Sequence, residues 1–76
     1  MKKLRGTYSQ VFKHNGMEYI AHVREYATFW EGETSVADYF KVYKDKNKRA
    51  VTRGITAWIF VQKHFMPIFD KTHKHR

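Results

Sequence analysis

Polar and apolar residues alternate on both sides of Asn15-Gly16 in the first third of the chain. Asn-Gly is a strong signal for a two-residue hairpin, because both residues tolerate the positive φ angles of a type I′ turn. Such a turn fixes the register and places Lys13 opposite Glu18. One face of the hairpin then collects the apolar side chains Tyr8, Phe12, Met17, Tyr19, Ala21 and Val23. The pattern predicts a β-hairpin over residues 7–24.

Residues 17–30 also fit a competing interpretation as a helix. Their larger side chains fall at helical spacing, at Tyr19, Val23, Tyr26 and Trp30. Periodicity alone does not separate the two structures. The enrichment in β-branched and aromatic residues, together with the turn, favours strands.

Residues 35–46 show the spacing of an amphipathic helix. Apolar side chains recur at i, i+3, i+4 and i+7, namely Val36, Tyr39, Phe40 and Tyr43. Ser35 is a suitable N-cap, and lysines follow near the end, where the helix dipole favours cations. We therefore expect a helix here. A third strand is the alternative, because Val36, Phe40 and Val42 also share one face of an extended chain.

The chain from Arg49 to about Phe65 is expected to form a second helix. Its apolar stripe is Val51, Ile55, Trp58 and Phe65. Gly54 costs this helix about 1 kcal/mol relative to alanine. Pro67 ends it, because the residue before a proline is pushed away from helical angles.

The 76 residues provide room for one domain and one hydrophobic core. We predict an α+β fold in which an N-terminal β-hairpin packs on one or two C-terminal helices. The alternative is a three-stranded antiparallel sheet with one C-terminal helix. Residues 1–6 and 70–76 are basic and are expected to be frayed ends of this single domain, residues 1–76.

The amino-acid composition excludes several kinds of covalent link, metal site and membrane segment. The sequence has no cysteine, which excludes disulfides and thiolate metal sites. It has 5 tyrosines, 6 phenylalanines and 2 tryptophans, enough large rings to build a small core. The longest apolar run, 57–61, is far shorter than the roughly 20 residues of a membrane span, and no apolar run of signal-peptide length follows the basic start. We expect a cytoplasmic protein that does not enter a membrane.

The net charge is +8, and the cations cluster between Lys41 and Arg53, where Asp45 is the only acid. Clustered lysine and arginine bind phosphate backbones with release of counterions. The predicted nucleic-acid-binding residues are Lys41, Lys44, Lys46, Lys48, Arg49, Thr52 and Arg53. The competing interpretation of this segment is a solvated charged face.

If two helices meet at residues 46–48, the second begins with Arg49, Thr52 and Arg53. In a helix-turn-helix, the start of the recognition helix reaches the edges of the bases. This arrangement favours DNA over RNA. The sequence therefore predicts non-catalytic nucleic acid binding, as in a DNA-binding regulator.

The runner-up hypothesis is a protein partner. Acidic and aromatic residues adjoin at Phe29, Trp30, Glu31 and Glu33, and interfaces use aromatic anchors with a polar rim. A small intracellular inhibitor or adaptor, of the kind that small viral genomes encode, would have such a surface. It would bind a host or partner protein.

Enzyme signatures are absent from the sequence. It contains no glycine-rich phosphate loop, HExxH pattern, GxSxG elbow or cysteine nucleophile. A metal-free ribonuclease built on histidines such as His14 and His22 is the catalytic alternative. His73 and His75 lie in a cationic tail that repels metal ions. We expect no enzyme activity, no metal and no cofactor.

Overall fold

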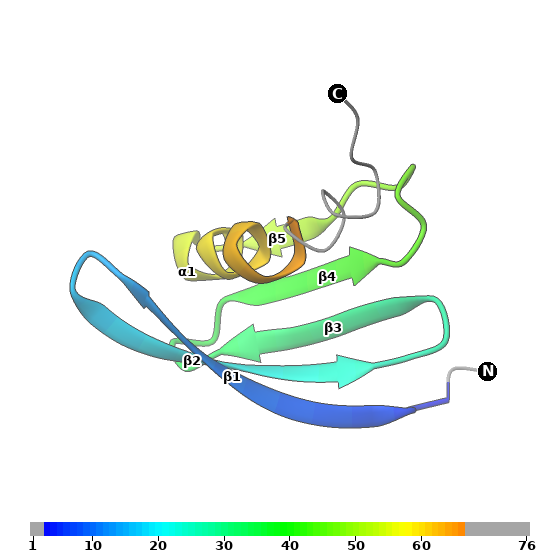
Figure 1. Cartoon of the computed structure of the whole chain (residues 1–76), viewed down its shortest axis with the longest axis horizontal. Helices are drawn as coiled ribbons and strands as arrows, with labels where there is room; N and C mark the ends of the chain where they lie inside the picture. The colour runs from blue at the N-terminus through cyan, green and yellow to red at the C-terminus, as the bar shows by residue number, and fades with distance from the viewer. Residues whose placement is uncertain (1–2, 67–76) are drawn as a thin grey trace.

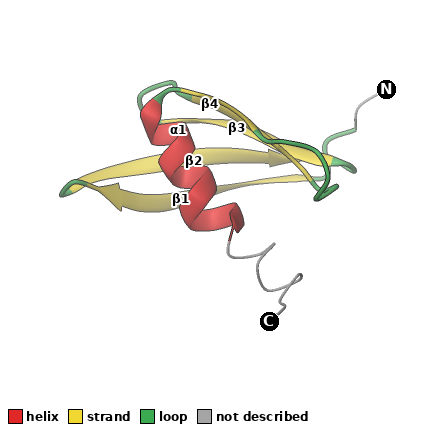
Figure 2. Cartoon of the chain, turned by 90° about the horizontal axis from the view of Figure 1, so that it is seen from above, coloured by secondary structure: helices red, strands yellow, loops and turns green. Residues whose placement is uncertain are grey.

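The computed structural model describes residues 3–66, which form one antiparallel sheet with a helix on one face. The strands follow each other in chain order, β1-β2-β3-β4-β5, each paired with the next (Figure 1). The helix lies across the sheet at an angle to the strands (Figure 2). The elements are β1 (Gly6–His14), β2 (Met17–Glu25), β3 (Phe29–Thr34), β4 (Tyr39–Tyr43), β5 (Val51–Arg53), α1 (Ile55–Phe60) and the π-helical turn η1 (Val61–Phe65). A five-stranded antiparallel sheet with one C-terminal helix is compatible with the predicted α+β class, although the sheet is larger than the predicted hairpin.

The first hairpin has the predicted register. Asn15 and Gly16 have φ angles of 52° and 78°, as a type I′ turn requires. Lys13 lies opposite Glu18 across β1 and β2, and the predicted apolar face is the one that α1 covers. The helical interpretation of residues 17–30 is wrong, because β2 pairs with strands on both sides.

Residues 35–46 do not form a helix. They contain the loop after β3 and then β4, in which Phe40 and Val42 are buried and their neighbours are half-buried. Ala37 has a φ angle of 66°, which interrupts any helix at that point. Ser35 does not cap a helix but continues the pairing with β2, since its N–H donates to the carbonyl of Ile20 at 2.8 Å. The strand alternative is the correct one, although the sheet has five strands and not three.

The second predicted helix starts six residues late. Residues 51–53 form the edge strand β5, and Gly54, with a φ angle of 101°, turns the chain into α1. A Cβ atom at Gly54 would lie 2.1 Å from Cγ of Asp38, so glycine is required there for space as well. The predicted stripe is also wrong in part, because Ile55 and Trp58 are exposed. The buried side chains of the helix are Thr56, Ala57, Phe60, Val61 and Phe65.

The core lies between the sheet and the helix, and Phe60 is at its centre. The Phe60 ring lies 5.3 Å from Phe12, 5.1 Å from Phe40 and 5.7 Å from Phe65, measured between ring centroids. Gly32 lets the sheet close beneath Phe40, because a Cβ there would lie 1.9 Å from the carbonyl oxygen of His22. Rings and small residues together make up this core.

The start of α1 is held by a buried polar network. The carboxylate of Asp38 accepts hydrogen bonds from the Thr56 N–H at 3.0 Å and from the Thr56 hydroxyl at 2.5 Å. The hydroxyls of Thr34 and Thr56, both on buried residues, lie 2.9 Å apart. Asp38 thus supplies from the β3–β4 loop the cap that Gly54 lacks.

The prediction of a frayed N-terminal end, residues 1–6, is wrong for its last two residues. Arg5 and Gly6 are not frayed: the Arg5 N–H donates to the carbonyl of Glu25 at 2.7 Å, and Gly6 begins β1. Residues 70–76 lie outside the described residues. None of the helical segments within residues 3–66 is long and apolar enough to cross a lipid bilayer.

Candidate nucleic-acid interface

The sheet face that α1 does not cover, called here the open face, carries most of the polar side chains of the strands. Successive side chains of a strand point to opposite faces of the sheet. The residues that pack under α1 therefore mark the covered face, and the residues between them along each strand point to the open face. The open face carries Thr7, Ser9, Val11, Lys13, Glu18, Ile20, His22, Arg24, Phe29, Glu31, Glu33, Tyr39, Lys41, Tyr43, Val51 and Arg53. Its acids are Glu18 on β2 and Glu31 and Glu33 on β3.

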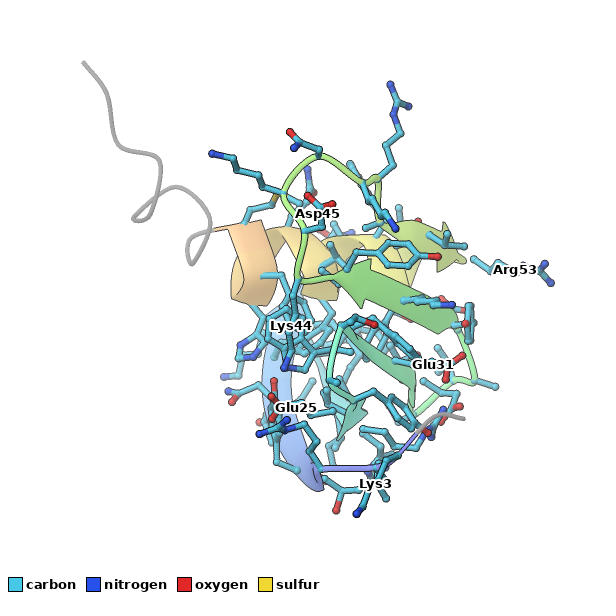
Figure 3. The ribbon with its side chains drawn as sticks, turned by 90° about the vertical axis from the view of Figure 1, so that its right-hand side faces the viewer. Lys3, Glu25, Glu31, Lys44, Asp45 and Arg53 are labelled. Atoms are coloured by element: carbon cyan, nitrogen blue, oxygen red, sulfur yellow. The ribbon has the colours of Figure 1, made fainter. Side chains whose placement is uncertain are left out.

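The connection between β4 and β5, residues 44–50, is called here the basic loop. Its turn is fixed by Asp45, whose carboxylate accepts from the Asn47 N–H at 2.9 Å and whose carbonyl accepts from the Lys48 N–H at 3.1 Å. The single acid of the segment is therefore engaged with the backbone. Lys46, Lys48 and Arg49 are exposed around it. Figure 3 shows this loop at one end of the molecule, around Asp45.

Lys44 is the one predicted phosphate ligand that is tied to a carboxylate. Its Nζ donates to Glu25 at 2.6 Å and lies 5.1 Å from the centre of the Trp30 ring. This hydrogen bond lowers the pKa of Glu25, which favours its carboxylate form. Figure 3 shows the two side chains directed toward each other. Lys44 anchors the basic loop to the β2–β3 end of the sheet.

Lys41 covers a group of aromatic rings on the open face. Its Nζ lies 4.5 Å from the centre of the Phe29 ring and 5.1 Å from that of Tyr43. Tyr26 stacks on Phe29 at 4.7 Å, and Lys48 extends from the basic loop to within 5.5 Å of Tyr43. These five residues form what we call the ring cluster. It joins the basic loop to the open face.

Thr52 and Arg53 do not begin a recognition helix. Both lie on β5, opposite Phe40 and Tyr39 of β4. Thr52 is half-buried on the covered face, whereas Arg53 is exposed on the open face and projects away from the body in Figure 3. The helix-turn-helix hypothesis is therefore wrong, because the segment around residues 46–48 joins two strands.

Four of the seven predicted phosphate-binding residues are exposed to solvent, on the basic loop or on the strand β5 that follows it. They are Lys46, Lys48, Arg49 and Arg53. Within residues 3–66 the ion pairs are Arg24–Glu33 and Lys44–Glu25, so these four cations form none there. Their charges remain available to an anion.

Three of the four residues of the predicted protein-binding surface, Phe29, Glu31 and Glu33, lie on the open face, and Trp30 does not. Phe29 is only 6% exposed within the ring cluster, so it cannot serve as an anchor for a partner. Trp30 points to the covered face and contacts Phe65 at 5.0 Å. Glu31 and Glu33 are on the open face and are engaged by neighbouring side chains.

Two polar contacts on the open face were not predicted from the sequence. Arg24 binds both carboxylate oxygens of Glu33, at 3.1 and 2.7 Å, which raises the pKa of Arg24 and lowers that of Glu33. The hydroxyl of Tyr39 donates to Glu31 at 2.5 Å. Burial and this bond raise the pKa of Tyr39 to about 12. Each contact is diagonal across paired strands, so only a known register could have revealed it.

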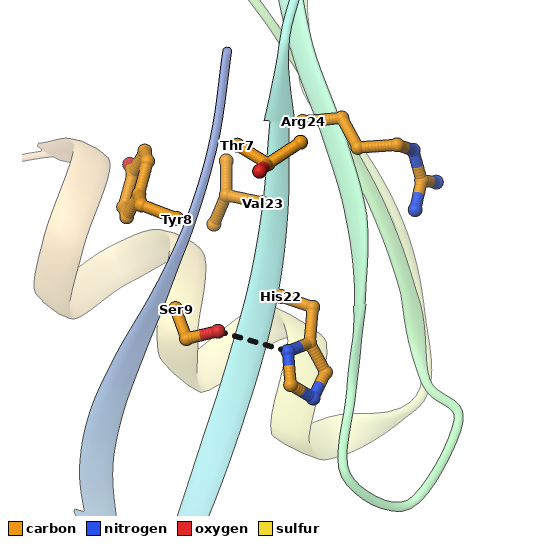
Figure 4. A pocket seen from close by; sticks show the side chains of 6 residues that line it. All are labelled: Thr7, Tyr8, Ser9, His22, Val23 and Arg24. Atoms are coloured by element: carbon orange, nitrogen blue, oxygen red, sulfur yellow. Dashed lines mark hydrogen bonds between the residues drawn. The ribbon is translucent and has the colours of Figure 1, made fainter.

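A hollow of about 310 Å³ lies near β1 and β2, where Ser9 and His22 meet (Figure 4). The Ser9 hydroxyl and Nδ1 of His22 are 3.0 Å apart. Glu33, which lies opposite His22, has both oxygens bonded to Arg24 and does not orient the imidazole. His14 lies on the other face of the hairpin, so the two histidines do not converge as a ribonuclease pair would require.

The part of the chain that the structure describes contains no group of three or more histidine or acidic residues that could hold a metal ion. His73 and His75 lie outside it. No family model, no curated protein and no solved structure matches this chain.

Proposed function

We propose that this protein binds nucleic acid without catalysis, through phosphate contacts made by the basic loop and Arg53. The observation that carries the proposal is the exposure of Lys46, Lys48 and Arg49 on one turn whose only acid is engaged by the backbone. Phosphate binding requires clustered, accessible cations and little geometric precision. Arg53, on the adjacent edge strand, extends the same charge toward the open face.

The mode of binding differs from the one that the sequence suggested. The buried side of α1 faces the sheet, and the cations lie on a loop and a strand, so no helix carries them into a major groove. Phosphate contacts position a nucleic acid but read no sequence. We therefore expect similar affinities for unrelated sequences, and both DNA and RNA are suitable probes.

The ring cluster supports a contribution from unpaired bases. Tyr43 is half-buried next to Lys48, at the junction of the basic loop with the open face. Bases of a single strand stack on such rings, and each stack contributes about 1–3 kcal/mol. A single strand that crosses the loop would reach Tyr43, whereas the paired bases of a duplex would not.

The test is the salt dependence of binding, measured by fluorescence anisotropy with labelled duplex DNA, single-stranded DNA and single-stranded RNA. If Lys46, Lys48, Arg49 and Arg53 contact phosphates, the slope of log K against log salt is about −3.6 on duplex DNA. The variant Lys46→Gln/Arg49→Gln should reduce this slope to about −1.8 and weaken binding to all sequences alike.

The matched control is Lys13→Gln/Lys63→Gln, which removes the same charge from exposed positions away from the basic loop. It should keep the slope of the parent protein. Equal slopes in the two variants would show that net charge alone drives binding, and the proposal would then fail. It would also fail if none of the three probes binds at low salt.

A further inference from the structure

Strand β1 forms one edge of the sheet. In the described part of the chain it pairs only with β2, along nine residues from Gly6 to His14. It contains no proline and no bulge in its pairing, two of the features that protect an exposed edge, and Lys13 is its one charged residue besides His14. Strand β5, at the other edge, has only three residues. The long unprotected edge is therefore that of β1.

The backbone groups that face outward along β1 follow from the hairpin. In an antiparallel pair, residues alternate between bonding the partner strand and facing away from it. The two-residue turn makes His14 and Met17 a bonded pair, so the outward set is Thr7, Ser9, Val11 and Lys13. The neighbouring strand agrees, because Ile20, which lies opposite Val11, bonds Ser35 on its other side.

One outward carbonyl is already satisfied from within the molecule. The side-chain amide of Gln10 donates to the carbonyl of Val11 at 3.2 Å. This bond marks the Val11 carbonyl as accessible from the edge, because the Gln10 side chain is itself exposed. A docked strand would replace that side-chain donor with a backbone N–H.

A groove of about 250 Å³ runs beside this edge, between β1 and the end of the helix. Residues 10–13 line one side, and Phe60, Lys63 and His64 line the other. Neither β1 nor residues 55–66 contain an acid. Burial lowers the pKa of His64 and disfavours its charged form. The cations beside the edge are Lys63, on the helix side, and Lys13, whose side chain points to the open face opposite Glu18 of β2. The edge is therefore flanked by one lysine on each side of the sheet.

We propose that the β1 edge binds an extended acidic segment of a partner protein, which adds to the sheet as a sixth strand. Its backbone would pair with Thr7, Ser9, Val11 and Lys13. Its carboxylates would meet Lys13 on the open face and Lys63 on the helix side, since side chains of a strand alternate between the two faces. The charge of the occupant follows from the groove, and a second copy of this chain, with net charge +8, is a poor match for it. The basic loop joins β4 and β5, at the other end of the strand order from β1. This site is therefore separate from the proposed nucleic acid site.

The probe is a capped nine-residue peptide of glutamate and valine with glutamates on both faces of the extended chain, compared with versions that carry glutamine or lysine in place of glutamate. Affinity is measured by NMR titration, and the site is identified by amide hydrogen exchange. The acidic peptide should protect the amides of Thr7, Ser9, Val11 and Lys13. The amides of Tyr8, Gln10 and Phe12 already bond β2 and should change little. The glutamine peptide should bind more weakly, and the lysine peptide most weakly.

Charge reversal tests the two flanking lysines without disturbing the core. The variant Lys13→Glu/Lys63→Glu should weaken binding of the acidic peptide by about ten-fold, because it replaces two attractive exposed pairs with repulsive ones. It should also strengthen binding of the lysine peptide. The matched control, Lys46→Glu/Arg49→Glu, makes the same change in charge on the basic loop and should leave peptide affinity within about two-fold.

Three results would overturn the proposal. One is the absence of protection at the outward amides when the acidic peptide is present. Another is equal binding of the acidic and lysine peptides to the parent protein. The third is concentration-dependent protection of the same amides without any peptide, which would mean that a second copy of the chain occupies the edge.

Discussion

The two faces of the sheet are built from the same strands but are stabilised differently. On β4, Phe40 and Val42 are 0% and 2% exposed beneath the helix, whereas their neighbour Lys41 lies half-buried across aromatic rings on the open face. The covered face is closed by ring packing around Phe60 and by the half-buried carboxylate of Asp38, which bonds Thr56. The open face is held by the Arg24–Glu33 ion pair, a tyrosine–glutamate hydrogen bond and cation–π contacts.

This difference indicates on which face amino-acid substitutions are tolerated and on which face they destabilise the fold. Burial of large rings contributes several kcal/mol per side chain, whereas an exposed ion pair contributes about 0–1 kcal/mol. The covered face therefore determines whether the chain folds. The open face and the two edges of the sheet can carry recognition, because substitutions there cost little stability.

The largest expected effect is on the covered face. Phe60→Ala removes the ring that contacts Phe12, Phe40 and Phe65, and should lower the free energy of unfolding by about 3–5 kcal/mol. Trp58→Ala is the matched control on the same helix, where the side chain is 45% exposed, and should cost about 1 kcal/mol or less. Urea denaturation measures both. Similar losses in the two variants would mean that the helix does not close the core through Phe60.

The next effect concerns the buried polar network. Asp38→Ala leaves the Thr56 N–H and hydroxyl without their acceptor and should cost about 1–3 kcal/mol. Asp38→Asn keeps one acceptor oxygen and should cost less. The same denaturation series measures both variants, with the helical circular dichroism signal as a second readout. An Asp38→Ala protein as stable as the parent would contradict the assigned cap.

The hairpin could be predicted from the sequence because its information is local. Asn15-Gly16 fixes the turn, and the turn fixes every pair along the two strands, including Lys13 with Glu18. The loop before β4 offers no such local signal. Ala37 adopts a left-handed φ angle without being glycine or asparagine, because Thr34 bonds the backbone around it.

The segment from residue 35 to residue 53 has helical spacing in sequence but forms strands, for a physical reason. The apolar positions Val36, Tyr39, Phe40 and Tyr43 fit helical spacing, yet Phe40 and Val42 are the two buried residues, at the spacing of a strand. Tertiary pairing with β3 overrides the local preference. The clustering of cations was evident from composition, but their placement on a loop depended on this pairing.

A smaller effect is expected for the ion pair on the open face. A double-mutant cycle with Arg24→Met and Glu33→Gln should give a coupling energy of about 0.2–1 kcal/mol, since both side chains are over 30% exposed. The hydrogen bond from Arg24 lowers the pKa of Glu33 in the folded protein. The coupling is therefore full above the ordinary glutamate pKa, near 4.3, and is lost as the pH falls through the lowered value. High salt should reduce it, and coupling that is unchanged by acid and salt would contradict an ionic origin.

The smallest expected change is the titration of Tyr39, which tests whether the open face is ordered enough to hold its polar contacts. Burial and the hydrogen bond to Glu31 raise the pKa of Tyr39 to about 12, above the ordinary value near 10. A group with a raised folded pKa contributes stability below its unfolded pKa and loses it as the pH rises through the folded one. Ultraviolet difference titration of the parent against Tyr39→Phe isolates this tyrosine, and Glu31→Gln should move its pKa back toward 10. If Glu31→Gln leaves the titration unchanged, the bond to Glu31 does not hold Tyr39, and the open face is looser than the covered face in its polar contacts as well as in its packing.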